Sequence, residues 1–137
     1  MRTALDTNIL SALWSSEPRA AAIPAQLTEA RLHGGLVICA PVYVELLAYP
    51  SATPRFVDDF LADTSIAVDF NVDEAIWREA ARGFVSYAER RRRSGGGSPK
   101  RLLVDFLIAS HAWLRADRLM TLDASRYQQD FPELRLV

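Results

Sequence analysis

The sequence predicts an α/β fold with a central, mostly parallel five-stranded sheet flanked by helices. Short apolar runs alternate along the chain with longer segments that have the pattern of helices. The runs are too short and too uniformly apolar for exposed hairpins, and alternation of strand and helix is typical of a parallel sheet. Half of the 137 residues are apolar, which is enough for one core, so we expect a single domain spanning residues 1–137.

The expected elements follow from local sequence signals. The five strands are the apolar runs at residues 3–5, 36–39, 66–70, 119–121 and 134–137. Helices are expected to begin at Glu17-Pro18 and Thr53-Pro54, where proline suits the first turn and threonine can cap it. A further helix is expected to open at Asp73-Glu74 and to run through Arg90.

Composition excludes several classes of protein. The formal charge of −1 shows no overall basicity, so any nucleic-acid surface must be local. Cys39 is the only cysteine, which excludes disulfide frameworks and cysteine-based zinc sites, and its apolar surroundings predict a buried thiol. The sequence shows no secretory leader and no apolar stretch long enough for a membrane span, so we expect a cytoplasmic protein without a membrane partner.

Two acidic residues directly follow predicted strands. Asp6 comes after residues 3–5, and Asp123 comes after residues 119–121. The carboxyl ends of parallel strands are where polar function gathers, so both residues are candidates for a site. Each also has a purely structural explanation, because Asp6 is a favoured helix N-cap and Asp123 suits a turn.

Two further acids stand in apolar surroundings. Glu45 lies in what reads as a helix starting at Pro41, and Asp105 lies in the apolar segment 102–109. A buried charge without a partner is costly, so each carboxylate must be neutralised, paired or bound to a cation. An ion pair with a nearby arginine would explain either acid alone.

If the four acids meet at one sheet edge, their repulsion requires a counter-charge. Oxygen ligands without histidine or cysteine select a hard ion, so Mg²⁺ or Mn²⁺ is expected and zinc is not. One such ion, or two about 3.5–4 Å apart, can activate water and neutralise a scissile phosphate. The cluster therefore predicts phosphodiester hydrolysis.

Four segments of the chain resemble, in order and spacing, the signatures of PIN-domain ribonucleases. They are residues 6–10, 45–47, 105–112 and 121–123. The likeness covers essentially the whole chain and is greatest to the VapC-type toxins of bacterial toxin-antitoxin pairs.

The resemblance implies a three-layer PIN-like fold and a metal-dependent endoribonuclease. By that likeness the metal-binding acids are Asp6, Glu45, Asp105 and Asp123, while Asn8 and Thr121 orient them. It also implies an RNA substrate, a homodimer, and a small antitoxin protein that occludes the cleft.

Basic residues are concentrated in one segment ahead of Asp105. Six of the sixteen fall within residues 90–101, namely Arg90, Arg91, Arg92, Arg93, Lys100 and Arg101. Residues 90–99 have low complexity and are expected to form a mobile surface loop. The basic side chains are predicted to contact RNA phosphates beside the acids, although a solvated helix end would have the same composition.

Two other functions remain open from the residues. One is a PIN-like binding module without catalysis. The other is an aspartyl-phosphate phosphatase, which would need a second aspartate where Asn8 stands and a clamping lysine, for which Lys100 is the only lysine.

Overall fold

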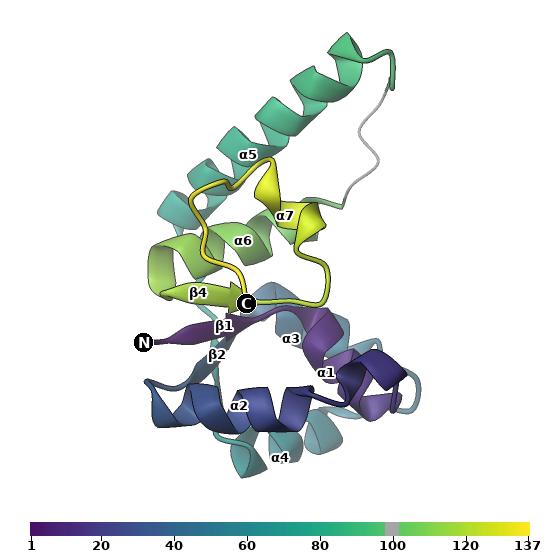
Figure 1. Cartoon of the computed structure of the whole chain (residues 1–137), viewed down its shortest axis with the longest axis vertical. Coiled ribbons are helices and arrows are strands. Elements are labelled where there is room, and N and C mark those ends of the chain that lie inside the picture. The colour runs from purple at the N-terminus through teal and green to yellow at the C-terminus, as the bar shows by residue number, and fades with distance from the viewer. Residues whose placement is uncertain (98–101) are drawn as a thin grey trace.

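A parallel sheet forms the centre of the molecule in the computed structural model, which describes residues 1–97 and 102–137. Its strands are β1 (Thr3–Leu5), β2 (Leu36–Cys39), β3 (Ile66–Asp69) and β4 (Arg118–Met120), in the order β3-β2-β1-β4 (Figure 1). Every pairing is parallel, with Ala4 opposite Val37 on one side and Leu119 on the other. The predicted α/β class is confirmed.

Within the described residues the sheet has four strands, so the expectation of a fifth strand at residues 134–137 is wrong. The turn after Phe131 extends to Leu134, whose amide donates to the Phe131 carbonyl at 3.1 Å and whose side chain is buried. Only the last three residues remain to pair, and they form a single parallel bridge between Leu119 and Leu136. The tail therefore lies beside β4 without becoming a strand.

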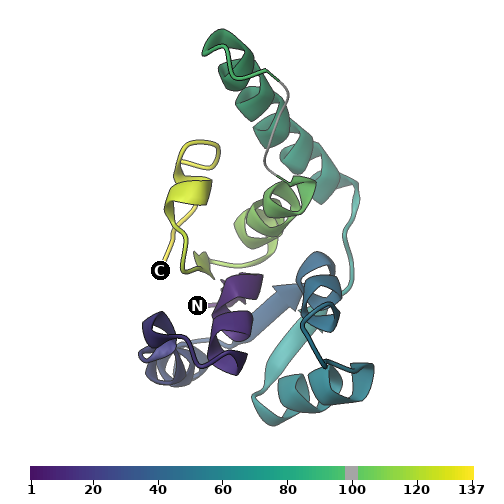
Figure 2. The ribbon, with the colours of Figure 1, turned by 90° about the vertical axis from the view of Figure 1, so that its right-hand side faces the viewer.

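Helices cover the sheet on both sides. They are α1 (Thr7–Trp14), η1 (Pro18–Ala20), α2 (Ile23–Leu32), α3 (Ala40–Leu47), α4 (Pro54–Asp63), α5 (Glu74–Arg93), α6 (Leu103–Arg115) and α7 (Ser125–Gln128). Figure 2 shows α1 and α2 on one side of the strands and α3 and α4 on the other. Helices α5 and α6 pack together, and α5 extends beyond the rest of the molecule (Figures 1 and 2).

Two of the predicted helix starts are confirmed by their caps. Thr53 Oγ1 accepts a hydrogen bond from the Phe56 amide at 3.1 Å, and Asp73 Oδ1 accepts one from Ile76 at 3.2 Å. The start at Pro18 gives only a short 3₁₀ helix, η1.

The segment expected to be a loop from residue 90 begins as helix. Residues 90–93 form the last turn of α5, because arginine is a good helix former. The helix ends at Arg93, and Gly95, whose φ of +76° suits glycine, follows the C-cap residue Ser94. Lys100 and Arg101 lie outside the described residues.

The core holds the strands and residues 105–112 of α6, all of which are buried. All residues of β1 and β2 are buried, including the Cys39 thiol, whose pKa burial raises to about 12. On α6, His111 is buried and its Nε2 lies 3.0 Å from Asp69 Oδ2, which ties the helix to the end of β3. Among the described residues, no helix is long and apolar enough to cross a membrane.

Candidate active site

The strand order brings three carboxyl ends together around β1. Strands β2 and β4 lie on opposite sides of β1. The chain passes from β1 to β2 on one side and later returns through β4 on the other side. Such a switch point leaves a crevice beyond the strand ends, where ligands bind in open parallel sheets. Asp6 follows β1 at this point, and its amide donates to the Met120 carbonyl at 2.9 Å.

Asp6 is a buried carboxylate held by three donors. Only 2% of the residue is exposed. Its Oδ1 accepts from the Thr7 amide at 2.7 Å, while Oδ2 accepts from the hydroxyls of Thr121 at 2.8 Å and Tyr127 at 2.7 Å. The residue is also the N-cap of α1, so the structural explanation weighed from the sequence holds alongside the functional one. These bonds replace water around the carboxylate and fix its orientation.

Thr121 and Asn8 connect Asp6 to the segment that carries Asp123. Thr121 Oγ1 donates to Asp6 and accepts from Asn8 Nδ2 at 3.3 Å and from the Asp123 amide at 3.0 Å. The Asn8 side-chain oxygen accepts from the Leu122 amide at 3.1 Å. The network joins the start of α1 to the chain leaving β4.

Glu45 reaches the same region from α3. Its Oε1 accepts from the Thr7 hydroxyl at 2.5 Å, so Thr7 contacts both Asp6, through its amide, and Glu45, through its side chain. Burial raises the pKa of the half-buried Glu45 carboxyl, and the charges of Asp6 and Asp105 raise it further, against the Thr7 hydrogen bond and the charge of Arg126. Glu45 therefore lies within the negative field of the other acids.

Arg126 brings Asp105 and Asp123 together. Asp105 lies in the first turn of α6, where the helix dipole favours a carboxylate, and is 8% exposed. Arg126 Nη1 is 3.5 Å from Asp105 Oδ1, and Nη2 is 3.0 Å from Asp123 Oδ2. The arginine partner considered from the sequence is therefore present for Asp105, and the same arginine also contacts Asp123.

Three residues of this network were not singled out from the sequence: Thr7, Arg126 and Tyr127. The first follows Asp6 directly, and the other two follow Asp123 by three and four residues, which is the spacing of one helical turn. That spacing is the signal that could have identified them. Burial and the nearby charge of Asp6 raise the pKa of the Tyr127 phenol, which keeps it a neutral donor.

The carboxylate oxygens of the four acids are the possible metal ligands of this region. Within residues 1–97 and 102–137, no three acid, histidine or cysteine side chains are close enough to form a ready-made metal-binding group. The acids offer only oxygen, as Mg²⁺ and Mn²⁺ prefer. The Arg126 guanidinium, itself a cation, is held between two of them. The acids therefore have the donor chemistry of a hard-cation site, while the described residues do not form a preassembled one.

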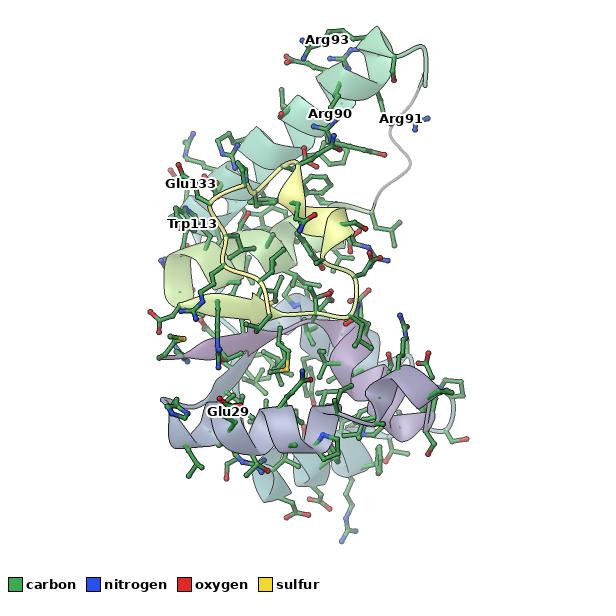
Figure 3. The ribbon with its side chains drawn as sticks, in the orientation of Figure 1. Glu29, Arg90, Arg91, Arg93, Trp113 and Glu133 are labelled. Atoms are coloured by element: carbon green, nitrogen blue, oxygen red, sulfur yellow. The ribbon has the colours of Figure 1, made fainter. Side chains whose placement is uncertain are left out.

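The arginines at the end of α5 lie far from the sheet. Figure 3 shows Arg93 at the tip of the helix and Arg90 and Arg91 just below it. Arg90 contacts both carboxylate oxygens of the buried Asp130, at 2.8 and 3.3 Å. Arg91 donates to the Gly96 carbonyl. Arg92 and Arg93 are exposed, and the predicted RNA contact of the segment stays a prediction.

Comparison with known proteins finds likeness at the level of family and fold. The PIN domain family model matches residues 3–132. A chain of VapBC2 from Rickettsia felis, bound to a DNA fragment from their promoter, is 21% identical with a TM-score of 0.66, covering 100% of this chain and 98% of that one. A chain of VapBC-1 from nontypeable Haemophilus influenzae is 22% identical with a TM-score of 0.65, covering 100% and 97%. No curated protein sequence gave a significant match.

Proposed function

The chain belongs to the PIN domain family, and we propose that it is an endoribonuclease dependent on Mg²⁺ or Mn²⁺. Its metal ligands would be Asp6, Glu45, Asp105 and Asp123. The observation that carries this proposal is the buried Asp6, which is fixed at the carboxyl end of the central strand and whose charge, with that of Asp105, raises the pKa of Glu45. A fixed carboxylate in a negative field is suited to binding a divalent cation and has little to add to an apolar core.

The residues around Asp6 have different roles in the proposed site. A bound divalent ion supplies a water of lowered pKa and neutralises charge on the scissile phosphate. Thr121 and Tyr127 hold Asp6 Oδ2, and Thr7 holds Glu45, so two of the acids have their oxygens oriented in advance. Asn8 keeps the loop after β4 in register with α1. These contacts lower the reorganisation required when a substrate phosphate arrives.

We also propose that the protein is the toxin of a bacterial toxin-antitoxin pair and acts as a homodimer in the cytoplasm. The support is the VapC-like order of its motifs and its similarity in fold to chains from two structures named VapBC. A small antitoxin protein that occludes the crevice would be its partner. Expression without that partner should slow bacterial growth, and Asp6→Asn should relieve the effect.

RNA contact by the basic segment remains part of the proposal in a narrower form. Arg90 holds the buried Asp130, so Arg91, Arg92 and Arg93, with Lys100 and Arg101, are the better candidates. Because the tip of α5 lies far from the sheet, these side chains would contact phosphates removed from a cleavage site at the end of β1 (Figure 3). Such contacts add affinity without selecting sequence.

Cleavage of labelled RNA tests the proposal directly. The native chain should cut with added Mg²⁺ and not with a chelator, and Asp6→Asn should lose cleavage while remaining folded. Asp59→Asn is the matched control, since it removes a carboxylate that is 69% exposed on α4, and it should cut normally. Equal cutting by the native chain and Asp6→Asn would contradict the proposed site.

The alternative of a binding module without catalysis has one observation in its favour. The guanidinium of Arg126 already contacts two of the acids, as in a site neutralised within the chain. RNA binding by the native chain without Mg²⁺-dependent cleavage would favour that alternative. The phosphatase gains no support, because both ends of the Asn8 amide are taken up by hydrogen bonds.

A further inference from the structure

We propose that Arg126 is a built-in counter-cation of the candidate site, which a divalent metal ion must displace from Asp105 and Asp123 in order to bind. This inference rests on the proposed function and concerns how the same site is regulated. It predicts that the arginine sets the metal concentration at which the site fills, and that removing the arginine tightens metal binding.

The guanidinium of Arg126 lies between the carboxylates of Asp105 and Asp123. Two different nitrogens of Arg126 face two different carboxylates, at 3.5 Å from Asp105 Oδ1 and 3.0 Å from Asp123 Oδ2. The acids come from α6 and from the loop after β4, so the arginine bridges two parts of the fold. It occupies the place between carboxylates where a bound cation would lie.

Arg126 and a divalent metal ion would compete for the carboxylate oxygens of Asp105 and Asp123. Mg²⁺ requires carboxylate oxygens at about 2.0–2.1 Å in near-octahedral geometry, which an oxygen shared with a guanidinium does not readily adopt. A guanidinium remains protonated at every accessible pH, so it cannot yield by losing a proton. The side chain has to move away for the divalent ion to gain both acids.

The guanidinium of Arg126 can turn away from the acids, whereas the neighbouring Tyr127 is held in place. The Arg126 side chain is 40% exposed and lies on the four-residue helix α7. Tyr127 is fully buried, and its hydroxyl holds Asp6 at 2.7 Å. The backbone of α7 can therefore stay anchored through Tyr127 while the guanidinium turns toward solvent.

Arg126→Gln tests the inference through metal affinity, measured by calorimetric titration of chelator-stripped protein with Mn²⁺. Changes beside metal ligands typically alter affinity by about 10- to 100-fold, so we expect binding about tenfold tighter than native. The melting temperature of the stripped variant should fall, since the acids lose their counter-charge, and its rise on adding Mn²⁺ should exceed that of the native chain. Arg78→Gln, which removes the exposed pair with Glu74 at 2.7 Å on α5, is the matched control and should bind as the native chain does.

Arg126→Lys covers the case in which the glutamine variant does not fold. One ammonium keeps the charge but does not bridge both acids as two nitrogens do, so it should bind Mn²⁺ more tightly than native by a smaller factor. Measurable binding by either variant where the native chain shows none also supports the inference.

The outcomes separate this inference from the proposed function. If the native chain binds Mn²⁺ and the folded variants bind it no more tightly, the role of Arg126 is overturned and the metal site stands. If neither the native chain nor the variants bind Mn²⁺, both proposals fail.

Discussion

Removing the hydroxyl of Tyr127, in Tyr127→Phe, should destabilise the metal-free protein by about 1.5–3 kcal/mol, the usual range for a hydrogen bond to a charged group. The estimate follows from the site: the phenol is fully buried, and it donates at 2.7 Å to an aspartate that is 2% exposed. Phenylalanine fills nearly the same space, so cavity formation adds little. With an unfolding entropy of about 0.3 kcal/mol/K for a chain of this length, the melting temperature should fall by about 5–10 °C.

Urea denaturation in chelator, followed by circular dichroism, measures this loss. Tyr49→Phe is the control, because the Tyr49 hydroxyl lies 2.8 Å from Ser15 Oγ, a neutral partner near the surface. It should cost about 1 kcal/mol or less. Equal losses in the two variants, or no loss in Tyr127→Phe, would refute the idea that the phenol stabilises a buried charged Asp6.

Two further predictions concern pH and salt. Because the fold raises the pKa of Glu45, the folded state takes up its proton more readily, and metal-free stability should fall as pH rises through the glutamate range and above it. In thermal melts without metal, Glu45→Gln should therefore be more stable than native near neutral pH and lose that advantage in acid; an advantage independent of pH would contradict this. Replacing Arg92 and Arg93 by alanine in an uncleaving Asp6→Asn chain should reduce the slope of log affinity for RNA against log salt by about 2. Arg90→Met should leave that slope alone and lower the urea midpoint, because it releases the buried Asp130; a changed slope with unchanged stability would reverse the two roles.

The strands were predictable because a parallel sheet buries both of its faces. Residues 36–39 are a short, uniformly apolar run, and every residue of β2 is buried. The same logic failed at residues 134–137, where Leu134 and Leu136 give an apolar pattern. There the apolar side chain of Leu134 is buried from within a turn, and hydrophobicity alone does not separate the two cases.

The positions of the acids were predictable, while their partners were not. Asp6 follows a strand, and the topology of a parallel sheet places such a residue at a functional edge. Tyr127 is 121 positions along the chain from Asp6, and an aromatic residue in a short amphipathic segment reads as core. The contact of its hydroxyl with Asp6 depends on the pairing of β4 beside β1, which brings the two distant residues together. The sequence allowed an arginine partner for Asp105, but fifteen arginines gave no means of choosing Arg126.

The means by which this site lowers its negative charge argue for a role beyond stability. Asp6 relies on hydrogen bonds, Glu45 has a raised pKa, and Asp105 and Asp123 share Arg126. Carboxylates that lie near one another repel, which opposes folding, and neutral side chains of similar size would relieve that repulsion. A chain selected for stability alone would gain by that replacement, whereas a divalent cation would remove the repulsion and use the same oxygens.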